Sequence, residues 1–383
     1  MIQRRHLLLA TPALLARPAG AQNMAAATAE GRIVTTPLAR GLANPWAVAV
    51  LPEGRLLVTE RPGRMRIVAA DGTLSAPLRG LPPVVVRGQG GLLDVVLAPD
   101  FASSGLVFWS YAEAAADGGG ANSTAVARGR LDVAGLALNE VRVIFRQRPK
   151  FDSGAHFGCR LVFDREGRLF VTLGDRFVRS EDAQLLDNDH GKVLRISPDG
   201  GVPDGNPFVG KAGAQPELWS FGHRNVQGAA LHPVTGELWT HEHGPQGGDE
   251  LNVDLAGRNY GWPLITWGRQ YVTGLKIGEG STRADIEPAV QTWVPSIAPS
   301  GMAFLAGKRY GAPPTGANAS VFIGALKAQA LVRLDLDGRR VLRETRYPVG
   351  ARVRDVRQAP DGHLLLLTDD GNDGRVLRVD RLD

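Results

Sequence analysis

The stretch REGRLFVTLGD, residues 165–175, places a polar turn around a glycine directly before a run of leucine, phenylalanine, valine and threonine residues. This order is typical of a short β-strand that begins at a tight turn. Five other segments of the chain repeat it. They are PEGRLLVTE (52–60), SSGLVFWSY (103–111), VTGELWTHEHG (234–244), NASVFIGALK (318–327) and PDGHLLLLTDD (360–370).

A second apolar alternation follows several of these units, as in GRMRIV (63–68), GKVLRIS (191–197), ALVRLDLDG (330–338) and GRVLRVD (374–380). A strand, a tight turn and another strand form the unit of a propeller blade, and long loops on one face account for the unequal spacing of the units. We therefore expect an all-β fold, a six-bladed β-propeller of four-stranded antiparallel blades. A β-sandwich and a pair of β domains are the alternatives.

The composition agrees with many short strands. The chain has 383 residues, of which 48 are glycine and 25 are proline, and both are spread along its length. These residues favour tight turns over long helices. The segment SEDAQLLDN (180–188) is a candidate for one short helix.

The first residues, MIQRRHLLLATPALLARPAGAQ, have the pattern of an export signal. A pair of arginines precedes a short apolar run, and small residues follow it at a cleavage site after Ala21. We expect a signal peptide over residues 1–21, of the twin-arginine or the general secretion type, and hence a periplasmic or secreted protein. The apolar run is too short to span a bilayer, so no stable membrane insertion is expected. Residues 22–32 are expected to be a flexible N-terminus, and residues 33–383 a single propeller domain.

The charge of the chain argues against a nucleic-acid partner. Without the three arginines of the signal, the net charge of +5 falls to about +2, and no basic run is present. The single cysteine, Cys159, cannot form an internal disulfide. An exported protein of this kind depends on its core, a bound metal or both.

Four cationic residues lie in the loops between the repeated units: Arg224, Lys327, Arg352 and Arg354. In a propeller these loops converge at one end of a central channel. Clustered cations repel one another unless an anion joins them, so a polycarboxylate or phosphorylated ligand would fit. The alternative is that each is a solvated surface charge.

The segment HEHGPQGGDE (241–250) is a candidate metal site. Its two histidines, His241 and His243, lack a third nitrogen or sulfur ligand at a convincing spacing, which disfavours zinc. Exposed carbonyls near carboxylates suit calcium better, because calcium prefers oxygen ligands. Glu250 could equally be a turn carboxylate that caps backbone amides.

His156 and Asp175 have the chemistry of a general base and the carboxylate that orients it. The spacing of the two residues does not show that they meet, and a lone histidine is more often structural. Both interpretations stay open on the residues alone.

Seven segments in a fixed order resemble one family. They are GQGGLLDVVLAPDF (88–101), HFGCRLVFD (156–164), GHRNVQG (222–228), EHGPQGGDELN (242–252), NYGWP (259–263), GALK (324–327) and RVRDVRQAPDG (352–362). The chain resembles the soluble aldose sugar dehydrogenases that use pyrroloquinoline quinone (PQQ), which belong with the soluble quinoprotein glucose dehydrogenases. The resemblance runs from about residue 33 onward, and the fold of this family is a six-bladed propeller.

The resemblance implies a role for each matched position. His156 matches the base that acts on the C1 hydroxyl of the sugar, and Asp175 matches the residue that orients it. Arg224 matches a residue that lines the quinone and stabilises charge on it. The remaining matches are Gln89 and Asn225 at the quinone and substrate, Lys327, Arg352 and Arg354 on the cofactor, Gly244 and Pro245 at the active-site calcium through their carbonyls, and Glu250 and Tyr260 at a second calcium.

The implied reaction is oxidation of an aldose at C1 to the lactone, with PQQ and calcium as cofactors and electrons passing to an external acceptor. Two positions depart from the glucose dehydrogenase branch, Ala155 in place of an acidic residue and His243 in place of an amide. The substrate loops also look shorter, so we expect a more open site and broad aldose specificity. A monomer is expected. A calcium-dependent sugar lactonase and a non-catalytic carbohydrate-binding propeller are the competing hypotheses; neither needs four cations at one site.

Overall fold

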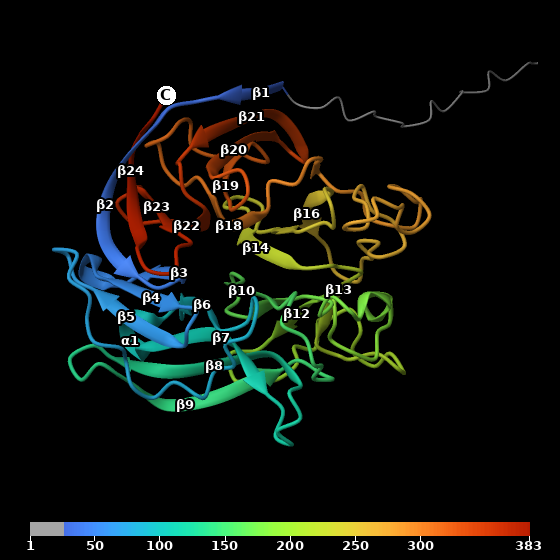
Figure 1. The fold of residues 1–383 in the computed structure, drawn as a ribbon, viewed down its shortest axis with the longest axis horizontal. Helices are drawn as coiled ribbons and strands as arrows, with labels where there is room; N and C mark the ends of the chain where they lie inside the picture. Colours follow the sequence, from blue (N-terminus) through green and yellow to red (C-terminus); the bar gives the residue numbers. More distant parts are fainter. Residues whose placement is uncertain (1–26) are drawn as a thin grey trace, which may run out of the picture.

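The computed structural model describes residues 27–383, and its strands form six sheets arranged around a central channel (Figure 1). The expected signal peptide, residues 1–21, lies outside the described residues. Neighbouring strands within each blade are antiparallel, apart from one added strand at the edge of a single sheet, and the innermost strands of adjacent sheets pack against one another. This confirms the six-bladed β-propeller of the sequence analysis.

The blades are numbered from the N-terminal side, and each runs from the channel outward. Blade 1 holds β3 (Pro45–Val50), β4 (Leu56–Glu60) and β5 (Arg64–Val68). Blade 2 holds β6 (Leu92–Leu97), β7 (Leu106–Ala114), β8 (Asn122–Asp132) and β9 (Ala137–Arg146). Blade 3 holds β10 (Gly158–Phe163), β11 (Leu169–Leu173), β12 (Lys192–Ile196) and β13 (Leu218–Phe221).

The second half of the ring continues in the same way. Blade 4 holds β14 (Val226–Leu231), β15 (Leu238–Glu242), β16 (Asp249–Asp254) and β17 (Gln291–Trp293). Blade 5 holds β18 (Pro299–Phe304), β19 (Ala319–Ala325), β20 (Ala330–Asp337) and β21 (Arg340–Pro348). Blade 6 holds β22 (Val353–Gln358), β23 (Leu364–Thr368) and β24 (Gly374–Leu382), and β2 (Ile33–Leu42) completes it.

Two sheets differ from the four-stranded rule. Blade 1 has three strands, and only an isolated bridge between Val68 and Leu74 continues it. Blade 5 gains a fifth strand because β1 (Ala27–Glu30) pairs with β21 in parallel. β1 lies within the segment expected to be flexible.

Helices are few among the described residues. They are α1 (Phe101–Ser104) and the 3₁₀ helices η1 (Pro52–Gly54) and η2 (Ser180–Gln184), the last within the segment predicted to be helical. None is long and apolar enough to cross a membrane.

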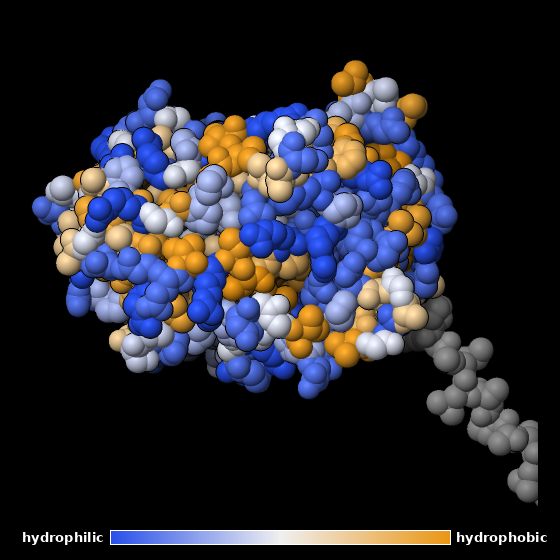
Figure 2. All heavy atoms as spheres, turned by 90° about the horizontal axis from the view of Figure 1, so that it is seen from below, coloured by the Kyte–Doolittle hydropathy of each residue, from blue (hydrophilic) through white to orange (hydrophobic). Residues whose placement is uncertain are grey.

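The core is divided among the blades. Six clusters of buried apolar side chains lie one between each pair of neighbouring blades. Leu, Val and Ile residues dominate because the alternating side chains of each sheet pack against those of the next. Figure 2 shows one side of the propeller, where hydrophilic residues (blue) predominate and hydrophobic residues (orange) form patches between them.

Every innermost strand shifts its register near its beginning. The shifts lie between Pro45 and Ala47, Leu92 and Val95, Gly158 and Leu161, Val226 and Gly228, Pro299 and Met302, and Val353 and Asp355. A bulge of this kind leaves one residue without a partner and re-aims its side chain. The bulges supply several of the residues that line the cavity of the candidate site, described below.

Candidate functional site

A cavity of about 300 Å³ lies at the channel and is lined by residues from all six blades and their loops. Four residues of the predicted site line it: Gln89, Asn225, Arg352 and Arg354. Trp46, Arg61, Gln227, His243 and Asp369 also line it, and the site prediction did not include them. The structure therefore brings together loops that are up to 325 residues apart, as in the hydrogen bond of 3.2 Å between Asn44 and Asp369.

His156 and Asp175 meet, as the base hypothesis requires. The His156 Nδ1 lies 2.6 Å from an Asp175 Oδ1, and both side chains are buried. His156 is adjacent to the cavity-lining Phe157, and its backbone N–H donates to the Gln89 side chain at 2.8 Å. The backbone of His156 has a φ of 49°, and Cys159 has a φ of 100°. Such conformations are costly for non-glycine residues and cluster at functional sites.

Asp175 is held by three donors. Its second oxygen accepts the indole N–H of Trp262 at 2.7 Å, and its first also accepts the backbone N–H of Phe177 at 2.7 Å. Burial acts to raise the pKa of Asp175, but the hydrogen bond and charge of His156 and the charge of Arg224 outweigh it and lower the pKa. Asp175 is therefore a carboxylate at neutral pH.

The pKa of His156 is lowered from its ordinary value, first by burial and then by the charge of Arg224, against the opposing effect of Asp175. The imidazole is therefore neutral at pH 7. Because the Nδ1–H of His156 donates its hydrogen bond to the Asp175 carboxylate, the lone pair of the neutral ring is at Nε2. A neutral histidine with a fixed tautomer can accept a proton from a substrate.

Arg224 lies beside this pair. Its backbone N–H donates to Glu242 at 2.5 Å, and its Nη1 donates to the carbonyls of His243 at 3.0 Å and Gly244 at 2.5 Å. The guanidinium carbon is 5.3 Å from the ring centre of Trp262. Arg224 thus links the predicted base region to the loop predicted to bind calcium.

The cations of the cavity have few counter-charges. Arg352 and Arg354 both approach Asp369, at 3.4 and 3.1 Å. Lys327 is exposed, follows the cavity-lining Leu326 and makes no ion pair with any of residues 27–383. The structure thus places Arg352 and Arg354 in the cavity lining and Lys327 directly after the lining residue Leu326, and a ligand with several carboxylates would complement them.

The loop after β15 presents backbone oxygens. The Gly244 carbonyl accepts Arg224, and its N–H donates to Asp249 at 3.0 Å. Pro245 is buried. The described residues contain no cluster of three or more histidine, cysteine or acidic side chains that could bind a metal, so a metal here would depend on carbonyls.

Glu250 and Tyr260 lie in and after blade 4. Glu250 is opposite Glu242 across the β15–β16 pair, and burial together with the charge of Glu242 raises its pKa to about 8. The Tyr260 hydroxyl donates to the carbonyl of Val253 at 2.5 Å and accepts the Leu255 N–H. No hydrogen bond joins Glu250 to Tyr260 within the described chain, so the second calcium site stays a prediction.

Trp262 is the residue that the sequence analysis missed most clearly. It belongs to the quoted segment NYGWP, yet its contact with Asp175 spans 87 positions. Trp46 and Arg61 lie in blade 1, where no site residue was predicted.

Known proteins resemble this chain in both sequence and fold. The sequence pattern of the Glucose / Sorbosone dehydrogenase family matches residues 42–378. Aldose sugar dehydrogenase YliI of Escherichia coli (strain K12) is 46% identical over 343 residues, which cover 88% of this chain and 90% of that protein. A crystal structure of glucose dehydrogenase superposes with a TM-score of 0.86 at 48% identity and covers 90% of this chain and 99% of the other.

A PQQ-bound aldose sugar dehydrogenase from Streptomyces coelicolor superposes with a TM-score of 0.72 at 29% identity, over 92% of this chain and 99% of that one. These matches extend across the whole propeller and confirm the resemblance drawn from the seven segments. The chain therefore belongs to the glucose/sorbosone dehydrogenase family.

Proposed function

We propose that this protein is a PQQ-dependent dehydrogenase that oxidises aldose sugars at C1 to their lactones. The observation that carries the proposal is the buried pair of His156 and Asp175, joined at 2.6 Å beside a cavity lined by cations. Its sugar dehydrogenase relatives, one of them solved with PQQ bound, support the choice of reaction and cofactor.

In this reaction His156 accepts the proton of the C1 hydroxyl at Nε2. Asp175 holds the Nδ1 proton and stabilises the imidazolium that forms, and Trp262 fixes the carboxylate from the other side. The lowered pKa of His156 keeps the ring ready to accept a proton at pH 7. Arg224 supplies a positive charge close to the same site.

The cavity fits PQQ by charge. PQQ carries three carboxylates, and Arg352 and Arg354 line the cavity with Asp369 as their shared partner, while Lys327 follows the lining residue Leu326. Gln89 and Asn225 add amide groups to the lining. When bound, PQQ supplies the acceptor for the hydride that leaves the sugar carbon.

The loop at Gly244 and Pro245 would hold the active-site calcium through its carbonyls, and calcium there would supply a Lewis acid. The Gly244 carbonyl accepts a hydrogen bond from Arg224 in this structure, so Arg224 would lie next to a calcium held by this loop.

The setting of the enzyme is proposed from the sequence. We propose that the protein is exported to the periplasm or secreted, works as a monomer and passes its electrons to an external acceptor.

Reconstitution tests the proposal. Purified protein is supplied with PQQ and calcium, and dye reduction is followed with several aldoses. The matched variants are His156→Gln and His190→Gln. His190 also pairs with a carboxylate, Asp182 at 2.7 Å, but its second nitrogen is occupied by the Pro149 carbonyl at 2.9 Å.

Sugar-dependent reduction is expected in wild type and in His190→Gln, and loss of at least about a hundredfold is expected in His156→Gln. Absence of reduction with every aldose, together with no tight binding of PQQ by wild type, would refute the proposed function.

A further inference from the structure

Arg160 is the residue that the proposed reaction leaves unexplained. It lies within the apolar strand β10 at the bulge between Gly158 and Leu161, and it is 2% exposed. A buried arginine is costly unless every donor finds a partner. Its partners therefore indicate what it does.

Three of those partners line the cofactor cavity. The Arg160 Nε donates to the Gln227 carbonyl at 2.8 Å, and Nη2 donates to the Arg354 carbonyl at 3.2 Å. The guanidinium carbon lies 4.2 Å from the ring centre of Trp46. Gln227, Arg354 and Trp46 are themselves bulge residues of blades 4, 6 and 1. One side chain thus connects three blades beneath the cavity.

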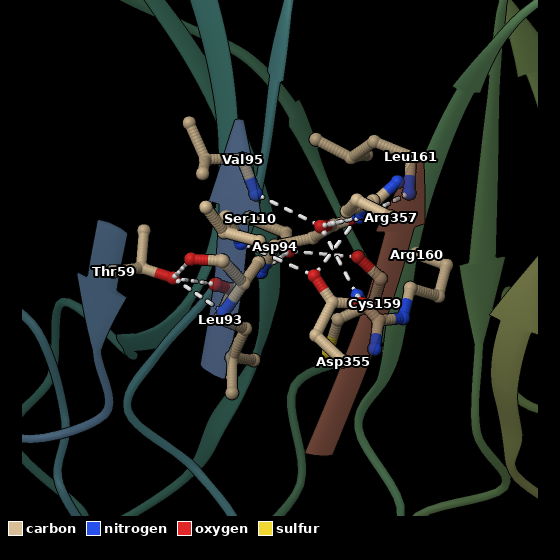
Figure 3. Close-up of polar contacts among 12 residues, drawn as sticks. Thr59, Leu93, Asp94, Val95, Ser110, Cys159, Arg160, Leu161, Asp355 and Arg357 are labelled. Carbon is tan, nitrogen blue, oxygen red and sulfur yellow. Dashed lines mark hydrogen bonds and ion pairs between the residues drawn. The ribbon is translucent and has the colours of Figure 1, made fainter. Parts of the chain in front are cut away.

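The charge of Arg160 is neutralised away from the cavity. Its Nη1 forms ion pairs with Asp355 at 2.8 Å and Asp94 at 3.3 Å. Arg357 pairs with the same two aspartates, at 3.0 and 2.6 Å, so the four groups carry no net charge (Figure 3). Arg160 therefore needs no anion from the cavity, and its fork is fixed before any ligand binds.

We propose that Arg160 is a positioning residue for the cofactor: it fixes the indole of Trp46 and the backbones of Gln227 and Arg354 without touching the cofactor itself. The inference rests on the proposed function, since it assumes that PQQ occupies the cavity. A rigid cavity wall lowers the entropy lost when a planar, highly charged ligand binds, so the effect falls on affinity.

Arg357 offers a matched control. It shares both aspartates with Arg160, but no hydrogen bond or cation–π contact joins it to Trp46, Gln227 or Arg354. In Arg160→Lys and Arg357→Lys the positive charge is kept and the planar fork is lost. The measurements are the Tm of each variant and its Kd for PQQ in excess calcium, followed by quenching of tryptophan fluorescence.

Both variants are expected to lower Tm, but only Arg160→Lys should weaken PQQ binding, by about tenfold or more, as for other groups that orient a binding site. A Kd within about threefold of wild type for Arg160→Lys, or an equal change in the two variants, would overturn the inference. If wild type fails to bind PQQ, the proposed function fails instead.

If Arg160→Lys does not fold, two double variants carry the same comparison. Asp94→Asn/Arg160→Gln and Asp94→Asn/Arg357→Gln each remove one charge of each sign from the network. Weaker PQQ binding in the first double variant alone supports the positioning role, and equal binding in both contradicts it.

Discussion

Replacing Asp175 by asparagine tests the role of the carboxylate in catalysis, because the substitution keeps the shape of the side chain and removes its charge. Asp175 accepts three hydrogen bonds, from His156, Phe177 and Trp262. An amide has one oxygen and one NH₂ group, so it cannot satisfy donors on both sides.

Both orientations of the amide are unfavourable. With its oxygen toward His156 and Phe177, the NH₂ group faces the indole N–H of Trp262, and two buried donors are left opposed. With its oxygen toward Trp262, the NH₂ group faces His156 Nδ1 and moves the imidazole proton to Nε2, which removes the base. Each orphaned donor costs about 1–3 kcal/mol of stability. Loss of the correct tautomer and of the imidazolium's counter-charge costs about 10³- to 10⁴-fold in rate.

The assay is the kcat/KM for an aldose with PQQ and calcium saturating, beside the Tm of each protein. We expect a fall in kcat/KM of about 10³- to 10⁴-fold, which corresponds to about 4–5.5 kcal/mol. The control is Asp182→Asn, which alters the second histidine–aspartate pair in the same blade and should change kcat/KM by less than about threefold. A fall of less than about tenfold in Asp175→Asn would refute the reasoning.

Three further outcomes are expected. The acid limb of the kcat/KM profile should lie below the ordinary histidine value of about 6.5, because the pKa of His156 is lowered and only the neutral ring accepts a proton; a limb above it would contradict this assignment. The pKa of Glu250 is raised to about 8 in the folded protein, against about 4.5 when the chain is unfolded. Between these two pH values the folded state holds a proton on Glu250 that the unfolded state has lost, so the free energy of unfolding should fall as the pH rises from about 4.5 to about 8. Denaturant unfolding in the presence of a chelator should show that Glu250→Gln is more stable relative to wild type at about pH 8 than at about pH 5, and a difference that does not depend on pH would count against the raised pKa. If Glu250 binds calcium, added calcium should stabilise wild type but not the variant. In Gly228→Ala the new Cβ would lie 1.9 Å from the buried His241 ring, so we expect a loss of about 1–3 kcal/mol in unfolding free energy, and an unchanged Tm would show that the ring can move.

The sequence predicted the fold because each blade repeats a local signal. Glycine turns and β-branched runs such as REGRLFVTLGD are readable within a dozen residues. The strand that completes blade 6 was not readable, because β2 and β24 pair across the length of the chain. The bulges also left no local signal, since a register shift depends on the partner strand.

The site residues that could be predicted are polar residues in a glycine-rich context, and those that were missed lie in segments that look like ordinary strands or loops. His156, Lys327 and Arg352 lie in or next to glycine-containing loops, where polar residues are readily noticed. Arg160 sits inside the apolar run GCRLVF, and Trp262 reaches Asp175 from a distant loop. The roles of Arg160 and Trp262 depend on contacts with residues from other blades, and these contacts form only when the ring is closed.

The pairing of β2 with β24 also sets an order of events in folding. The Thr36 hydroxyl contacts the Asp380 carboxylate at 2.6 Å across 344 positions. Bringing such distant segments together costs about 5 kcal/mol of chain entropy, and the corresponding cost is smaller for each hairpin within a blade, because its strands are close in sequence. Contacts of this separation slow folding, so we expect the blades to form first and the ring to close last. Until then the edges of blade 6 are unpaired and can associate with other chains, which makes the closing step the point most exposed to aggregation.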